Sequence, residues 1–276
     1  MRKILLALPM IAGAAWANPA MAQDRDTHFD GPYVSVSIGQ AAATNRDGVD
    51  PVVFDTNRDG TYGDQVTTTT GFNAFSPGFC PGVASGNAQG NCAGDKNGVE
   101  YSARLGYDMR MGDIVIGGLI EGAKPEAMDA ASAFSTTPAG YHLAREIDWS
   151  ASARARLGYT PGGGALFYAT GGGSYAKVNH TFSTTNTANS FTPTSDGDMI
   201  WGWQAGGGAE IMVAKNFSVG LEYLYNRYDD DKYFVAIGPG TASATNPFLL
   251  NGGGTNMRQD TRFEFHSVRA TLNLRF

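Results

Sequence analysis

The C-terminal segment alternates apolar and polar residues with a period of two. From Val268 to Phe276 every second residue is apolar, and polar residues, including Arg269 and Arg275, lie between them. Such a period places each set of side chains on one face of a β-strand. An apolar face, arginines on the other face and a terminal aromatic residue are typical of a membrane β-barrel with lipid outside and water inside. We therefore interpret Phe276 as the signal read by the barrel-assembly machinery.

The same alternation recurs in eight segments. Three gaps between them are tight and four are long, which fits a barrel with short periplasmic turns and long external loops. We predict an all-β fold, an eight-stranded antiparallel up-and-down transmembrane β-barrel with long external loops. The predicted strands are residues 31–43, 98–110, 113–123, 146–160, 165–184, 198–214, 217–229 and 261–276. The predicted loops are residues 44–97, 124–145, 185–197 and 230–260.

One face of the predicted strands carries aromatic and apolar residues, and the other carries charges of both signs. Trp149 and Tyr159 share the apolar face and are separated by roughly 25 Å along the membrane normal, for a strand tilted by about 40°. This spacing matches the apolar band between two aromatic girdles. Tyr107, Phe217 and Phe276 join Tyr159 on the periplasmic rim. The lumen-facing charges are Glu100, Arg104, Glu121, Arg154, Arg156, Glu210, Glu222, Arg269 and Arg275.

Eight strands enclose an interior just wide enough for side chains to fill. Charges of opposite sign in that space are expected to pair, because an isolated buried charge is costly. We therefore favour a barrel plugged by ion pairs over a narrow channel for small solutes. A soluble lipocalin-like barrel is the alternative fold, and it is disfavoured because the outward-facing set carries no charge.

The N-terminal residues match the pattern of a secretory signal peptide. A positive start precedes a short apolar run, residues 4–16, and an Ala-x-Ala site that ends at Ala22. This pattern predicts a signal peptide over residues 1–22 and a mature barrel over residues 23–276. A membrane anchor is the alternative, but the run is too short to span a bilayer and is interrupted at Pro9.

The mature chain is acidic, with 18 basic and 26 acidic residues after removal of the signal peptide. This charge argues against nucleic acid as a partner. The expected partners are outer-membrane lipid and lipopolysaccharide, and the barrel-assembly machinery during biogenesis. Outward faces rich in alanine and glycine on the middle strands are also compatible with homo-association.

The first predicted loop, residues 44–97, contains a segment that resembles half of a calcium loop. Oxygen-bearing side chains at alternate positions, followed by Gly60, match the first half of an EF-hand-type loop. The last position of such a loop is a bidentate Glu but is Val66 here, so the pattern is incomplete. A solvated Asp/Asn/Gly turn is the alternative, and no other cofactor is expected. The candidate calcium ligands are Asp55, Asn57, Asp59, Thr61 and Asp64.

The same loop holds both cysteines of the chain, Cys80 and Cys92. An even number of cysteines in an exported protein favours a disulfide. This bridge would close a short loop and contribute about 3 kcal/mol in the chain-entropy model. No histidine lies nearby in the sequence, so a zinc site would lack ligands. We predict a disulfide that orders the first loop.

An enzymatic hypothesis depends on the histidines. A lipid-modifying acyl hydrolase needs a Ser nucleophile with a His base within reach. His266 lies next to Ser267, but neighbours on a strand point to opposite faces. His142 and His180 lie on or near external loops without a recognisable constellation. We predict that the protein is not an enzyme, and lipid-modifying catalysis is the alternative.

Two segments resemble the porin-like (opacity/OmpA-type) small outer-membrane β-barrel proteins of alphaproteobacteria. They are RARLGYTPGGGALFYATGGGSYA, residues 154–176, and WGWQAGGGAEIMVAKNFSVGLEYLYNRY, residues 201–228. With Phe276, the resemblance covers most of residues 98–276 and implies an eight-stranded barrel in the cell outer membrane without a cofactor. The expected role is structural or surface-interactive, through envelope integrity, adhesion or loop-mediated contacts. The alternative is a narrow porin-like channel for small solutes.

Overall fold

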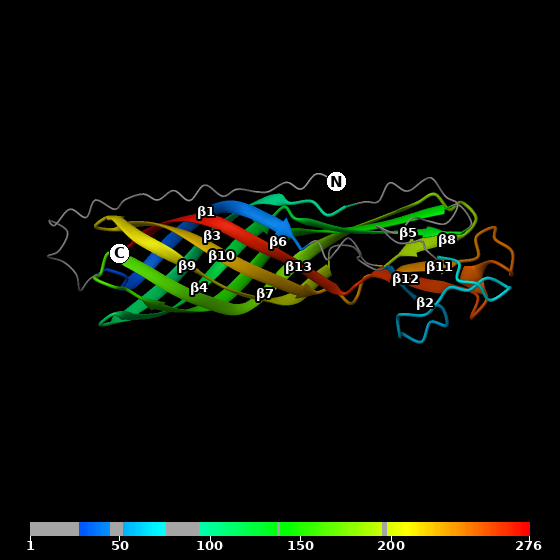
Figure 1. Ribbon diagram of the computed structural model, residues 1–276, viewed down its shortest axis with the longest axis horizontal. Helices are drawn as coiled ribbons and strands as arrows, with labels where there is room; N and C mark the ends of the chain where they lie inside the picture. Colours follow the sequence, from blue (N-terminus) through cyan, green and yellow to red (C-terminus); the bar gives the residue numbers. More distant parts are fainter. Residues whose placement is uncertain (1–27, 45–51, 76–93, 137–138, 195–197) are drawn as a thin grey trace.

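The computed structural model describes residues 28–44, 52–75, 94–136, 139–194 and 198–276. These residues form a long β-barrel with a smaller β-structure at one end (Figure 1). No helix among them is long and apolar enough to cross a bilayer. The predicted signal peptide, residues 1–22, and the predicted disulfide between Cys80 and Cys92 lie outside the described residues, so both stay predictions.

Eight antiparallel strands form the barrel, as predicted from the alternation. They are β1 (Gly31–Ala43), β3 (Gly98–Met111), β4 (Ile114–Pro125), β6 (Ala139–Tyr159), β7 (Ala165–Thr184), β9 (Asp198–Ala214), β10 (Phe217–Asp229) and β13 (Arg262–Arg275). Their order around the wall is β4-β3-β1-β13-β10-β9-β7-β6, and pairing of β4 with β6 closes the barrel. The predicted bounds agree with the observed ones to within two residues, except at the start of β6.

The three predicted tight turns join β3 to β4, β6 to β7 and β9 to β10. Gly112 in the first turn has a φ of 65°, and Gly162 and Gly163 in the second have φ values of 72° and 84°. This left-handed region is open to glycine at little steric cost, so these glycines let the chain reverse within a few residues. The C-terminus lies at the same end of the barrel as the turns (Figure 1).

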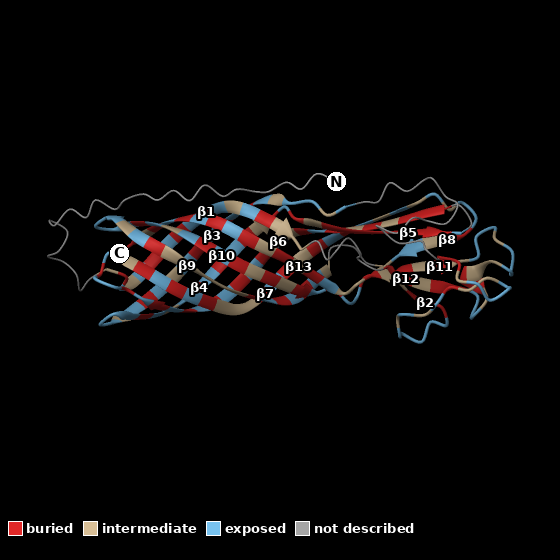
Figure 2. Ribbon diagram, viewed as in Figure 1, coloured by how far each residue is buried: buried red, intermediate tan, exposed pale blue. Residues whose placement is uncertain are grey.

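Burial alternates along each barrel strand and gives the chequered pattern of Figure 2. On β13, Arg269 is 1% exposed, whereas its neighbour Val268 is 56% exposed. Among the described residues, the exposed large apolar side chains lie on the barrel wall and in its turns, with Phe72 of the first loop as the exception. Polar residues inside and apolar residues outside are the arrangement expected of a wall that faces lipid.

The segments predicted as external loops build a second sheet beyond the barrel. Its strands are β2 (Val52–Asp55), β8 (Ser190–Pro193), β11 (Val235–Gly238) and β12 (Thr255–Gln259). They are ordered β2-β12-β11-β8, and the 3-10 turn η2 (Pro247–Leu249) lies between β11 and β12. A further strand, β5 (Met128–Ser135), pairs with the start of β6. We call these strands, with residues 139–147 of β6 and 177–184 of β7, the cap.

The prediction that residues 124–145 form a loop is wrong, because β5 and the first part of β6 lie there. The reason is a β-bulge in β6, where the register against β7 shifts between Ile147 and Trp149. Trp149 is 42% exposed, whereas Ile147, two residues earlier, is 1% exposed. An extra residue in one strand reverses the parity of its alternation. The odd-numbered residues of β6 therefore face lipid on one side of the bulge and the interior on the other.

Candidate functional site

The barrel interior holds two groups of ion pairs between side chains of six strands. Glu222 on β10 pairs with three arginines at distances from 2.8 to 3.4 Å. Glu121 on β4 lies 2.9 Å from both Arg104 and Arg154, and Arg269 reaches it at 3.0 Å. Three arginines face three glutamates, so the charges of this upper group balance, as buried charges require. The upper group is Glu100, Arg104, Glu121, Arg154, Glu222 and Arg269.

A lower group of ion pairs lies nearer the periplasmic end. Arg275 lies 3.0 Å from Asp108 and 2.9 Å from Glu210. Arg156 pairs with the same two carboxylates. Its guanidinium also lies over the ring of Tyr168, 3.9 Å from the ring centroid, an arrangement that stabilises a cation. Two arginines therefore balance two carboxylates in this group.

The structure places all nine predicted lumen charges inside the barrel, and none is more than 5% exposed. Sequence reasoning left Asp108 out of that set, although it has the inward parity of β3 that would identify it. It also missed Tyr168, whose hydroxyl donates to Glu222 at 2.9 Å. Tyrosine gives no charge signal in a sequence, so only its inward parity on β7 pointed to the lumen.

Apolar layers close the interior above and below the ion pairs. Phe29, Val115 and Leu166 pack together at the periplasmic end. At the external end, nine buried residues form what we call the mouth layer. The mouth layer is Ala41, Ala127, Ile147, Ala176, Val178, Ile200, Tyr228, Phe263 and Phe265. A hydrated ion would lose its water there without gaining polar partners, so the described residues form a filled barrel.

The cap has its own apolar core, to which the external segments contribute jointly. Phe54 and Phe75 of the first loop have ring centroids 4.6 Å apart, and Phe248 of the fourth loop lies 5.8 Å from Phe75. Tyr141 on β6 lies 5.7 Å from Phe248 and 6.0 Å from Phe191 on β8. Aromatic rings at such distances bury a large apolar area, and they hold the external segments in one unit.

A buried polar cluster joins the cap to the barrel. Arg145 on β6 donates to Asp129 at 2.7 Å and to Asp230 at 3.2 Å. It also donates to the carbonyl of Arg262 on β13 at 2.6 Å. His180 on β7 donates through Nε2 to Asp230 at 2.9 Å. We call Asp129, Arg145, His180 and Asp230 the junction cluster.

The candidate calcium ligands begin at Asp55, the last residue of β2, and carboxylate oxygens among them accept hydrogen bonds from the chain itself. Asp55 accepts from the amides of Asp59 and Gly60 at 3.1 and 3.0 Å. Asp64 accepts from the amide and hydroxyl of Thr56 at 2.9 and 3.0 Å. The described residues contain no group of three or more His, Cys, Asp or Glu placed to hold a metal ion. Calcium binding by Asp55, Asn57, Asp59, Thr61 and Asp64 stays a prediction.

A serine–histidine pair that sequence reasoning missed forms in the cap. Ser132 on β5 and His142 on β6 are cross-strand partners, with Oγ 2.8 Å from Nδ1. Burial lowers the pKa of His142, which favours the neutral ring that a general base requires. Ser132, however, is only 1% exposed, so a substrate cannot reach its hydroxyl. The geometry supports a structural hydrogen bond.

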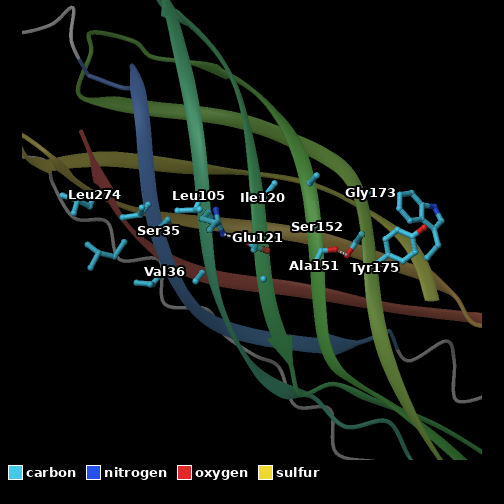
Figure 3. Close-up of a pocket in the computed structure, with 18 of the residues that line it drawn as sticks. Ser35, Val36, Leu105, Ile120, Glu121, Ala151, Ser152, Gly173, Tyr175 and Leu274 are labelled. Carbon is cyan, nitrogen blue, oxygen red and sulfur yellow. Dashed lines mark hydrogen bonds and ion pairs between the residues drawn. The ribbon is translucent and has the colours of Figure 1, made fainter. Parts of the chain in front are cut away.

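The outer wall carries an apolar groove of about 940 Å³ that crosses β1, β3, β4, β6 and β7 (Figure 3). Ala151 and Gly173 lie in it between Leu105 and Ile120 on one side and Tyr175 on the other. The small residues leave the wall shallow there. Because the groove lies on the apolar outer face, it belongs to the membrane-contacting surface. Homo-association through this face stays a prediction.

Comparison with known proteins agrees with this architecture. The chain matches the family model for the outer membrane protein beta-barrel domain over residues 4–276. It is 32% identical over 131 residues to the 31 kDa outer-membrane immunogenic proteins of Brucella melitensis biotype 1 and Brucella suis biovar 1. These matches cover 48% of this chain and 47% of each relative, so the chain spans about half the length of the curated relatives it matches.

Two solved structures illustrate the range of structural similarity. The outer membrane protein OprG from Pseudomonas aeruginosa matches with a TM-score of 0.50 and 11% identity, over 90% of this chain and 98% of that chain. The outer membrane protease OmpT from Escherichia coli matches with a TM-score of 0.36 and 8% identity, over 90% and 97% of the two chains. At these identities, the similarity to OprG shows the fold alone.

Proposed function

Because the chain belongs to the outer-membrane β-barrel family and lies in the cell outer membrane, we propose that it is a closed barrel whose cap makes contacts at the cell surface. Its role is surface interaction and support of the envelope, without catalysis. The observation that carries this proposal is the apolar core of the cap, which joins segments of all four external loops. Loops that only connected strands would not need a shared core.

The cap stands clear of the membrane. On β7 the outward residues change from Tyr175, at the edge of the apolar wall, to Lys177, Asn179 and Thr181. The strand continues through Thr184, and at about 3.3 Å per residue it rises by up to about 30 Å beyond that edge. Large partners outside the cell would reach the cap before the barrel, which supports a contact role.

The filled interior supports this role over a narrow channel. Refolded protein, shown to be folded by its heat-modifiable gel shift, is expected to give no steady conductance in a planar bilayer. The reason is that the ion pairs leave no unpaired lumen charge in either group and the mouth layer lies above them. Reproducible unit steps that change in Arg154→Ala would contradict the proposal and move the function to a narrow solute channel.

The contact role is tested on cells of a non-adherent strain that display the protein. Attachment is measured to a sulfated polysaccharide, to an extracellular-matrix protein and to a lawn of cells that display the same chain. On at least one of these surfaces, more cells that display the wild-type protein are expected to attach than cells that display the variant Phe54→Ala, Met257→Ala, in which the cap core is disrupted. Equal attachment on all three, at equal surface amounts, counts against the proposal.

The partners follow from the same placement. Outer-membrane lipid and lipopolysaccharide would surround the apolar wall. Phe276 is 69% exposed on that wall, and its amide donates to the carbonyl of Pro32 at 3.1 Å. This side chain is accessible to the assembly machinery. A disulfide between Cys80 and Cys92, and calcium at the turn after β2, would further order the first loop.

A further inference from the structure

We infer that the junction cluster is an acid-sensitive latch that holds the cap onto the barrel mouth. The cluster lies between the mouth layer on one side and the cap core on the other. Its four side chains are each at most 9% exposed. The inference concerns the attachment of the cap that we propose as the contact surface, and it does not depend on what the cap contacts.

Arg145 makes the central contacts of this latch. Its guanidinium contacts Asp129 of β5, Asp230 of the fourth loop and the carbonyl of Arg262 at the start of β13. It also lies 5.2 Å from the ring centroid of Phe263, a member of the mouth layer. One side chain therefore ties two external loops to a barrel strand. In contrast, the ion pairs Lys177–Asp148, Arg227–Glu264 and Arg262–Asp260 use cations whose side chains are at least 34% exposed.

The charged and titratable groups around Arg145 come from each element that packs against it. His180 of β7 donates to Asp230, and its ring stacks on Tyr233 of the fourth loop with centroids 3.9 Å apart. Asp95, before β3, accepts from the amide of Ala130 at 3.0 Å. Burial and the nearby charge of Asp129 raise the pKa of Asp95. Asp95 also shares a side-chain hydrogen bond with Asp129, so a proton on Asp95 favours the folded cluster in acid and opposes part of the loss at Asp230.

The charge state of the cluster sets the direction of the pH effect. Burial opposes the charge of Asp230, but the hydrogen bond from His180 and the charge of Arg145 outweigh it and lower the pKa of the Asp230 carboxyl. The stabilisation that results from this lowered pKa is fully present above the ordinary aspartate pKa of about 3.9. It is lost as the pH falls from there through the lowered pKa of the folded state. Arg145 then stays charged and buried without a full set of anionic partners, which is costly.

The apolar contacts of the mouth layer and the cap core do not titrate. Acid therefore acts on the junction, and the cap core that this junction supports then opens more often. We expect the cap to loosen from the barrel mouth below about pH 4 while the barrel strands remain hydrogen-bonded. The cap would then present its surface in two attachment states, set by external acidity.

The test is hydrogen–deuterium exchange of the full chain in detergent micelles at neutral pH and near pH 3.5, corrected for the intrinsic exchange rates. Protection of β11 and β12 is expected to fall by up to about threefold near pH 3.5, and toward about tenfold for each unit by which the Asp230 pKa is depressed once the pH is below that lowered pKa. Protection of β13 residues 268–275 should stay unchanged. Unchanged protection of β11 and β12, or an equal loss in β13, would overturn the latch.

Variants separate a latch from a merely structural contact. Asp230→Asn should lower cap protection at neutral pH and reduce its pH dependence. The triple variant Asp129→Asn, Arg145→Met, Asp230→Asn removes the charges together, so its cap protection should be the same at both pH values. If this variant folds by its gel shift and keeps the wild-type pH dependence, the cluster is not the switch.

The matched control is Asp148→Asn, which breaks the exposed pair between Asp148 and Lys177, 3.5 Å apart. This pair lies on the outer surface next to the junction, and exposed pairs contribute little. The variant should behave as wild type at both pH values. Because the readout is exchange and not attachment to a partner, failure of the latch leaves the contact proposal standing, and failure of attachment leaves the latch standing.

Discussion

At the scale of single residues, the lumen shows how a buried charge is tolerated. Arg269 is 1% exposed and lies within 3.0 Å of three carboxylates, those of Glu100, Glu121 and Glu222. The alternation along β13 predicted that Arg269 points inward. It did not predict these partners. Glu222 is the direct cross-strand neighbour of Arg269 on β10, which depends on the strand register, and Glu100 and Glu121 come from β3 and β4, which meet β13 only across the barrel interior. Removal of one partner leaves the others buried and uncompensated.

Arg269→Met is expected to destabilise the barrel by about 3–5 kcal/mol, because three carboxylates lose their shared cation in a dry interior. The measurement is urea unfolding in micelles, followed by the heat-modifiable gel band. Arg262→Gln serves as the control, since Arg262 is paired only at 3.7 Å with Asp260 and its side chain is 44% exposed. The control should change stability by less than about 1 kcal/mol. Equal effects of both variants would rule out a special role for the lumen network.

At the scale of elements, β6 passes from a lipid environment to a water environment within one strand. Below the bulge its apolar side chains face outward, and above it Tyr141, Leu143 and Ile147 face the interior at 1% exposure each. The sequence pattern of β6 therefore looks broken near Asp148, and the prediction began the strand only at residue 146. β7 makes the same change without a bulge, because its inward residues turn from polar to apolar at Ala176.

Deletion of Asp148 is expected to remove the bulge and force one parity on the whole of β6. The lipid-facing part is anchored by pairing on both sides, so the cap part should lose its inward apolar face. Limited proteolysis should then cleave the cap while the gel shift of the barrel persists. Asp148→Asn keeps the chain length and should leave the cap resistant. A resistant cap in the deletion variant would show that the bulge does not set the parity.

The cap core gives a second prediction at this scale. Phe54→Ala is expected to destabilise the cap by about 3–5 kcal/mol, because it removes a buried aromatic ring and leaves a cavity. Hydrogen exchange of β11 and β12 reports this loss, and the barrel band in a gel should not change. Phe72→Ala on the same loop is the control, because Phe72 is 74% exposed. Loss of protection in the control as well would mean that the loop, and not its core, governs the cap.

At the scale of the whole molecule, the wall defines where the membrane lies. The tryptophans of the described residues, Trp149, Trp201 and Trp203, sit on neighbouring parts of the outer wall toward the cap. Tyr159 and Phe217 lie at the opposite end. Tryptophan favours the interface between hydrocarbon and head groups. The barrel therefore spans the bilayer, and the cap lies beyond the hydrocarbon region.

In bilayers, tryptophan fluorescence is expected to be quenched more by a quencher near the head groups than by one at the acyl-chain ends. The reason is that all three tryptophans lie at the outer rim of the apolar wall. Vesicles with shallow or deep quencher lipids provide the measurement. Trp149→Phe should keep the same order of quenching with a weaker signal. Stronger quenching by the deep quencher lipid would show that the tryptophans lie inside the hydrocarbon region and not at its boundary.

The sequence by itself determined the eight barrel strands, their inner and outer faces and the end of the barrel where the tight turns lie. Alternation with a period of two and glycine in a turn are local properties, so residues such as Arg154 and Gly112 carry that information in their own neighbourhood. The bounds of β1, β7, β9 and β10 follow from the same signal.

Only the tertiary structure decided the ion-pair partners in the lumen, the cap and the junction cluster. Arg145 meets Asp230 across 85 positions of the chain, and Arg269 meets Glu100 across 169. Such pairs form because closure of the barrel brings together strands that are distant in the sequence. The alternation within one strand carries no information about these partners. The short cap strands bury their apolar residues against strands from other loops. Their apolar residues do not form one regular face along each strand, so the sequence pattern alone does not predict them.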